Sequence, residues 1–142
     1  MLLISHRGNT IGPNLERENH PDYISEALKK NFYVEVDIWL QNNSYYLGHD
    51  EPMYDLSEDL LKNNKILFHA KNYEALKKLY QDKVHFFWHQ NDDYTITSEG
   101  LIWVYPGKNF SKESIVVLPE LFTKNLKLDC KGICSDFIEN YK

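Results

Sequence analysis

The segment that most constrains the fold runs from Tyr33 to Leu40, YVEVDIWL, and places two carboxylates inside an otherwise apolar stretch. In a strand, alternate side chains point to opposite faces, so the aliphatic residues share one face while Glu35 and Asp37 share the other. Carboxylates whose Cβ atoms lie about 7 Å apart repel each other unless protons, cationic side chains or a metal ion intervene. The segment therefore predicts either a divalent-metal site or an edge strand whose carboxylates face water.

Length and charge limit what surrounds this strand. A chain of 142 residues is long enough for one domain, spanning 1–142, and short for two. The formal net charge of −5 argues against a general nucleic-acid binder. No apolar run approaches membrane-spanning length and the first residues lack the pattern of a secretory signal, which predicts a cytoplasmic protein without stable membrane insertion. Cys130 and Cys134 are expected to be reduced, because a lone C-x3-C is neither a disulfide framework nor a zinc site.

Short apolar runs alternate with helical patterns along the chain, and most of the runs end in polar residues. Strands are expected at residues 2–5, 33–40, 45–50, 65–71, 84–88, 101–105, 114–118 and 132–136, with helices starting at 20–22 and covering 56–61 and 73–80. This order predicts a mostly parallel sheet, and polar strand ends favour a compact TIM-type β/α barrel. Because a full barrel takes about 200 residues or more, its helices would be shortened or missing. An open α/β sheet is the structural alternative.

The connection from 41 to 44 is too short for a parallel crossover and predicts an antiparallel hairpin after the acidic strand. An odd-length turn would place His49 opposite Asp37, whereas a two-residue turn at Asn42 and Asn43 would need a bulge at Gly48 to do so. Both alternatives bring a histidine near the carboxylates.

The predicted strand ends carry residues suited to phosphodiester hydrolysis. Those residues are His6, Arg7, Glu35, Asp37, His49 and Lys71. The reaction needs charge stabilisation on the phosphoryl oxygens, a base for the nucleophile and an acid for the departing alkoxide. Trp103 is a candidate substrate contact, because its strand ends at a turn-like Pro-Gly. Each residue also has a plainer interpretation: a core histidine, surface cations and a packing tryptophan.

The ordered motifs resemble the glycerophosphodiester phosphodiesterase family of the phospholipase-C-like superfamily. The residues that carry the resemblance are His6-Arg7-Gly8, Glu35-Val-Asp37 and His49-Asp50, with weaker matches at Glu18-Asn19, Lys71 and Gly132–Asp136. The resemblance implies a barrel, His6 and His49 as the acid/base pair, and Glu35 and Asp37 as ligands of magnesium or calcium. It further implies phosphate contacts from Arg7 and Lys71, and either hydrolysis or attack by a substrate hydroxyl to give a cyclic phosphate.

Three departures from the family pattern stand out. The chain has Arg17-Glu-Asn-His20 where the family usually has Pro-Glu-Asn-Thr, it has His69 where an acidic third metal ligand is common, and it is much shorter. Glu18 and His69 are therefore both open as further ligands. Magnesium and calcium prefer oxygen ligands, so the histidine bears directly on the metal.

The sequence thus predicts a metal-dependent hydrolase of a small phosphodiester, with no nucleic-acid partner. The alternative is a domain of the same fold that binds a phosphorylated ligand without turnover, and a purely structural role is a third possibility. Truncated helices could be replaced by subunit contacts, which would allow a homodimer.

Overall fold

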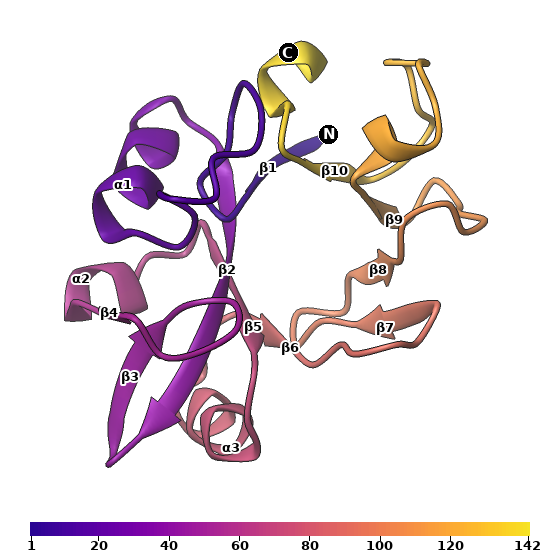
Figure 1. Ribbon diagram of the computed structural model, residues 1–142. Coiled ribbons are helices and arrows are strands. Elements are labelled where there is room, and N and C mark those ends of the chain that lie inside the picture. The colour runs from indigo at the N-terminus through magenta and orange to yellow at the C-terminus, as the bar shows by residue number, and fades with distance from the viewer.

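The computed structural model describes residues 1–142, which form one curled sheet with helices against part of it (Figure 1). The strands are β1 (Leu2–His6), β2 (Tyr33–Gln41), β3 (Ser44–Leu47), β4 (Tyr54–Asp55), β5 (Ile66–Ala70), β6 (Phe86–Phe87), β7 (Tyr94–Ile96), β8 (Ile102–Val104), β9 (Ser114–Val117) and β10 (Gly132–Ser135). The α-helices are α1 (Pro21–Lys29), α2 (Glu58–Leu61) and α3 (Tyr73–Asp82), and two 3-10 turns are η1 (Pro119–Leu121) and η2 (Ile138–Tyr141). None of the helices has the length and apolarity that crossing a membrane requires.

The sheet mixes parallel and antiparallel pairs. A parallel series runs β8-β9-β10-β1-β2-β5-β6, so the first and last strands of the chain are neighbours. Antiparallel partners extend it, with β3 and β4 beyond β2 and with β7 beside β8. Because the carboxyl ends of parallel strands meet at one edge, the residues that follow β1, β2 and β5 are brought together.

The predicted TIM-type β/α barrel is wrong, because the sheet is a mixed half-barrel that lacks alternating helices. All three α-helices lie before residue 83, outside the N-terminal part of the sheet (Figure 1). From β6 onward the strands are joined by a hairpin, loops and 3-10 turns. The segment 105–113, YPGKNFSKE, illustrates the cause: its proline, glycine and polar residues offer no apolar stripe for a helix.

The helices begin where the sequence supplies caps. His20 caps α1 by accepting the backbone N–H of Asp22, and a proline occupies the first turn. Asn72 caps α3 by accepting the N–H of Ala75, and its amide also bonds both backbone groups of Leu40 at distances of 2.8 and 3.1 Å. Asn72 thus fixes the start of α3 to the carboxyl end of the acidic strand.

Two hydrophobic clusters lie on opposite faces of the sheet. The outer cluster joins the sheet to the helices and includes Val34, Val36, Ile38, Phe68, Ile24 and Leu79. The inner cluster lies within the curl and includes Ile4, Leu67, Phe87, Trp103, Ile115 and Val117. Strand periodicity puts Glu35 and Asp37 on the inner face, where their neighbours across the ladder are Leu67 and His69 of β5.

The hairpin after the acidic strand has a two-residue turn, with Asn42 and Asn43 both at positive φ. The alternative with an odd-length turn is therefore wrong. Gly48 adopts φ +152°, and a Cβ atom there would lie 2.0 Å from the carbonyl oxygen of Glu51. This backbone, open only to glycine, ends the ladder and turns the chain toward His49.

Candidate active site

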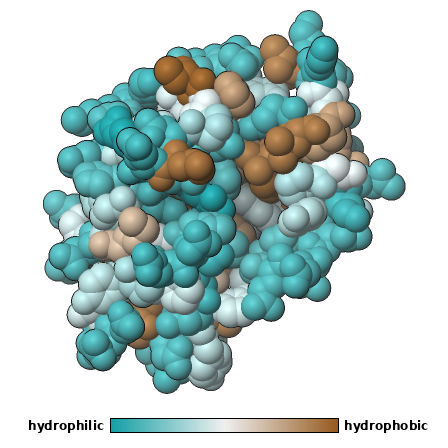
Figure 2. Space-filling model, in the orientation of Figure 1, coloured by the Kyte–Doolittle hydropathy of each residue, from teal (hydrophilic) through white to brown (hydrophobic).

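A cavity of about 620 Å³ opens at the carboxyl ends of the parallel strands. Its charged and polar lining includes His6, Arg7, Glu18, Glu35, His49, His69, Lys71 and Asp136. Its apolar lining includes Leu15, Phe87, Trp103, Val117, Leu118 and Leu121. Figure 2 shows a hollow near the centre of this face with apolar side chains beside it. The cavity thus has two chemically different walls, which we call the charged wall and the apolar wall.

His6, at the end of β1, is oriented by Asp136, which follows β10. The Nδ1 atom of His6 donates to Oδ1 of Asp136 at 2.8 Å, because a carboxylate can only accept. The Nε2 atom remains free, 3.9 Å from Oε2 of Glu35. Burial lowers the pKa of His6, but the bond to Asp136 and the charge of Glu35 outweigh it, so the pKa is raised. Burial would raise the pKa of Asp136, but the bond to His6 outweighs burial, so the pKa of Asp136 is lowered.

Asp37 lies beneath the cavity with 0% side-chain exposure and is surrounded by donors. Its Oδ2 is 2.9 Å from Nε of Arg7 and accepts a hydrogen bond of 3.0 Å from the Asn19 amide. Asn19 also accepts the backbone N–H of Asp37. Burial alone would raise the pKa of Asp37, but His69, Arg7 and Lys71 hold it well below its usual range. Asp37 is therefore a fixed anion.

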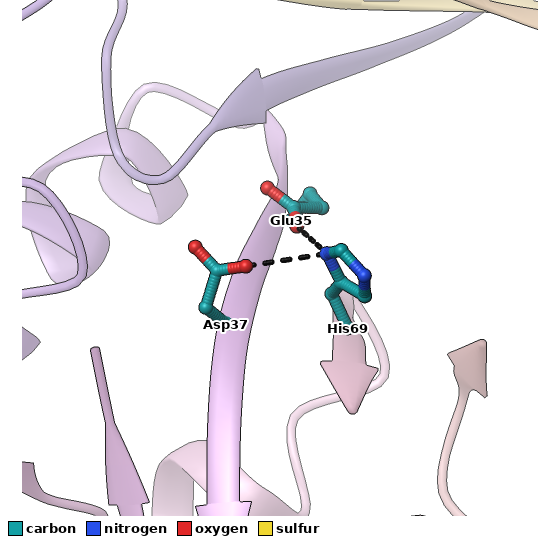
Figure 3. Close-up of side chains that lie close together, drawn as sticks. All are labelled: Glu35, Asp37 and His69. Atoms are coloured by element: carbon teal, nitrogen blue, oxygen red, sulfur yellow. Dashed lines mark ion pairs between the residues drawn. The ribbon is translucent and has the colours of Figure 1, made fainter. Parts of the chain in front are cut away.

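His69 projects from β5 toward both carboxylates (Figure 3). Its Nδ1 lies 3.2 Å from Oδ1 of Asp37 and 3.5 Å from Oε1 of Glu35. Its Nε2 donates to the carbonyl of His89 at 2.8 Å, and its ring stacks on Phe87 at a centroid distance of 4.8 Å. Burial lowers the pKa of His69, but the two carboxylates reverse this and raise the pKa to about 9.

These three side chains form a group whose ligand atoms all lie within 4.8 Å of one another. Oε2 of Glu35 and Oδ1 of Asp37 are buried and accept no hydrogen bond of normal geometry. Buried carboxylate oxygens without such partners are costly, and a cation at this point would satisfy them. The donor set of two carboxylates and one imidazole fits a divalent ion.

Three further residues predicted from the sequence, Lys71, Trp103 and His49, each have a different environment at the cavity. Lys71 lines the cavity, with Nζ 3.7 Å from Oδ1 of Asp37. Trp103 is 4% exposed and packs on Phe87, so it belongs to the inner core as well as to the apolar wall. His49 lies at the cavity with an exposed ring, and its Nδ1 is 2.8 Å from Oδ1 of Asp50. Six of the seven predicted residues line the cavity, and Asp37 lies under it.

Sequence reasoning did not assign roles to several polar residues of the site. Asp136 orients His6, and Asn9 donates to both Asp136 and Glu18, linking the loop after β1 to the end of β10. Glu18 also accepts from Nη1 of Arg7 at 3.2 Å. The available signals were the weaker family matches at Glu18-Asn19 and Gly132–Asp136, and the place of Asp136 at the end of the last apolar run. Asn9 carried none.

Comparisons with models of protein families, with curated proteins and with solved structures found no match to this chain.

Proposed function

We propose that the protein is a metal-dependent phosphodiester hydrolase that acts on a glycerophosphodiester or another small phosphodiester. One observation carries the proposal: two histidines line one cavity, and each has a carboxylate on Nδ1 that leaves Nε2 for proton transfer. The partners are Asp136 for His6 and Asp50 for His49. The ordered H-R-G, E-x-D and H-D motifs support the same proposal.

The two histidines divide the proton transfers. One accepts the proton of the attacking water, or of a neighbouring substrate hydroxyl, as the new P–O bond forms. The other protonates the departing alkoxide as the old P–O bond breaks. Attack by water gives a monoester and an alcohol, whereas attack by a substrate hydroxyl gives a cyclic phosphate and an alcohol.

Arg7 and Lys71 supply positive charge to the phosphate. Both line the cavity, and contact with Asp37 holds them in place. Charge-assisted bonds from such groups position a phosphate and stabilise the charge that develops on its oxygens. An ion held by Glu35, Asp37 and His69 would add Lewis-acid stabilisation of the phosphoryl oxygens.

The test is hydrolysis of glycerophosphodiesters and of a chromogenic bis-aryl phosphodiester, with and without added divalent ions. We expect His6→Ala and His49→Ala each to lower kcat by about a hundredfold or more. His20→Asn serves as the control, because it replaces a histidine outside the cavity and keeps an N-cap for α1. Activity that survives both alanine substitutions would exclude this mechanism.

Binding of a phosphorylated ligand without turnover is the second candidate. Two observations favour it: the Arg7 guanidinium is already engaged by Asp37 and Glu18, and His69 already lies between two carboxylates. A network balanced in this way could hold a phosphate without assisting its chemistry. Calorimetry with phosphomonoesters and diesters separates the candidates, since binding without product under any added ion supports this one.

A further inference from the structure

We infer that the group formed by Glu35, Asp37 and His69 selects a nitrogen-binding divalent transition ion, such as Mn²⁺, Co²⁺ or Zn²⁺, over Mg²⁺ and Ca²⁺. The inference deepens the proposed function and rests on its metal requirement. It replaces the magnesium or calcium that the family resemblance implied. Three features of the site carry it: the presentation of the imidazole, the spacing of the ligand atoms and the balance of charge.

The imidazole of His69 is presented as a ligand. Because Nε2 donates to the carbonyl of His89, the lone pair of the neutral ring is on Nδ1, the atom nearest to both carboxylates. The stack on Phe87 fixes the plane of the ring. Metal-binding histidines characteristically donate their second nitrogen to a carbonyl or carboxylate in this way, which orients the ring and fixes the tautomer.

The distances from the imidazole to the two carboxylates suit a small ion. Two ligands at about 2.0–2.2 Å from one ion, at angles between octahedral and tetrahedral, lie about 2.8–3.6 Å apart. Nδ1 of His69 is 3.2 Å from Oδ1 of Asp37 and 3.5 Å from Oε1 of Glu35. Ca²⁺, with about 2.3–2.6 Å to each of six to eight oxygens, needs a wider and more oxygen-rich site. Mg²⁺ has a similar radius to the transition ions, but it prefers oxygen, so the nitrogen decides against it.

The balance of charge leaves room for a divalent cation. Four carboxylates surround the floor and charged wall of the cavity, namely Glu18, Glu35, Asp37 and Asp136, against the permanent cations Arg7 and Lys71. Two negative charges therefore remain for the histidines or an ion to balance. In the metal-free chain, cationic His6 and His69 face these oxygens, at 3.9 Å from Oε2 of Glu35 and 3.2 Å from Oδ1 of Asp37. Neither oxygen accepts a hydrogen bond of normal geometry, so a bound divalent ion would take over the balance of charge from the protonated imidazoles.

The experiment is metal binding to the chelator-treated full chain, with each of the five ions titrated alone by calorimetry. A second measurement, pulsed electron paramagnetic resonance of bound Mn²⁺, detects a directly bound ¹⁴N in the unaltered protein. We expect one site, ¹⁴N coupling, and affinity for Co²⁺ and Zn²⁺ that falls by about tenfold or more in His69→Gln, while affinity for Mg²⁺ changes little. In His69→Glu, the preference for Co²⁺ and Zn²⁺ over Mg²⁺ and Ca²⁺ should be smaller still than in His69→Gln, because a third carboxylate favours oxygen-binding ions.

The controls keep the outcomes separate. His20→Asn replaces a histidine outside the site and should bind all five ions like the unaltered chain. Absence of ¹⁴N coupling, absence of stoichiometric binding, or equal losses for Co²⁺ and Mg²⁺ in His69→Gln would overturn the inference. The resonance measurement needs no variant, so it decides even if a His69 variant fails to fold. Selective binding without diester hydrolysis would leave this inference standing and overturn the proposed function.

Discussion

The two walls of the cavity are stabilised in different ways. The charged wall comes from β1, β2, β5 and the loops after β1, β3, β5 and β10. Its groups have fixed partners, as Asp136 fixes His6 and Asp37 fixes Arg7. The apolar wall comes from β6, β8, β9, η1 and the loop after β1. Packing holds Phe87, Trp103 and Val117, whereas Leu15 and Leu121 are exposed. Most of the charged wall lies where α-helices support the sheet, whereas β8 and β9 of the apolar wall lie on the side away from the α-helices (Figure 1). The comparison shows that side chains with fixed partners are concentrated on the charged wall. Under the proposed function, the phosphate would bind at the charged wall and an uncharged substituent would contact the apolar wall.

The largest effect is expected for Asp37→Ala. The substitution leaves Arg7 without its buried counter-ion and Asn19 without its partner, and breaking a buried pair in this way costs about 3–5 kcal/mol. Asp50→Ala is the control, because Asp50 is exposed and its removal should change the free energy of unfolding by less than about 0.5 kcal/mol. Chemical denaturation of both variants measures the difference. Equal stabilities would mean that the charged wall is no more constrained than the surface.

The next effect is a pH dependence that belongs to the charged wall. The pKa of His69 is raised to about 9 in the folded chain, above the ordinary 6.5. Its contribution to stability is therefore complete below about pH 6.5 and is lost as the pH rises through 9, by about 3 kcal/mol in the metal-free protein. His6, whose pKa is also raised, adds a loss of the same sign.

Denaturation with a chelator at several pH values measures this loss. His69→Gln should remove most of the decline, while His20→Asn should retain it. A metal-free protein whose stability is flat from pH 6.5 to 9 would contradict the ion pairing of His69.

A smaller effect is expected when Asp136 becomes Asn. The substitution keeps the size of the side chain but removes the charge that helps to raise the pKa of His6, so the limb of the pH–rate profile governed by His6 should move to lower pH. We expect kcat to fall by about tenfold, less than the hundredfold or more for loss of His6 itself. Asp129→Asn, at an exposed aspartate, is the matched control. If kcat falls but the pH–rate profile does not move, Asp136 has only a structural role.

The smallest effect is expected on the apolar wall. Leu121 is 70% exposed and lines the cavity, so Leu121→Ala should leave the fold intact and remove apolar contact with the substrate. We expect KM for a bis-aryl diester to rise by about three- to tenfold with kcat unchanged, and KM for a glycerophosphodiester to change less. Steady-state kinetics on both substrates checks this. A matching rise for both would show that the apolar wall does not distinguish substituents.

Individual strands and helices could be predicted from the sequence, whereas the curling of the sheet into a half-barrel could not. The strand over 33–40 and the inward face of Glu35 and Asp37 follow from period-two alternation, and the helix at 73–80 follows from its apolar spacing. The barrel prediction failed because alternating helices need an apolar stripe in each connection between strands, and the connections after β6 do not supply one. The antiparallel pairs at the two ends of the sheet are β3 with β4 and β7 with β8. Their pairing depends on turns and loops, whose conformations are harder to predict from the sequence than strands and helices are.

For the site, single residues at strand ends were predictable and their partners were not. His6 and Lys71 follow apolar runs, so their placement at one edge could be expected. Asn19 reaches Asp37 from a loop 18 residues away, and Asp136 reaches His6 across 130 residues. Such contacts depend on the whole fold rather than on spacing within a motif.

The pairing of β1 with β10 has a consequence for how the chain folds. Leu2 lies opposite Gly132, so one edge of the first strand stays open until the last strand has been synthesised. Such distant pairing slows folding, because closing a long loop costs entropy before β1 and β10 make any stabilising contact. On a nascent chain, the edge of β1 that later pairs with β10 is therefore unprotected, and chaperones would have to shield it.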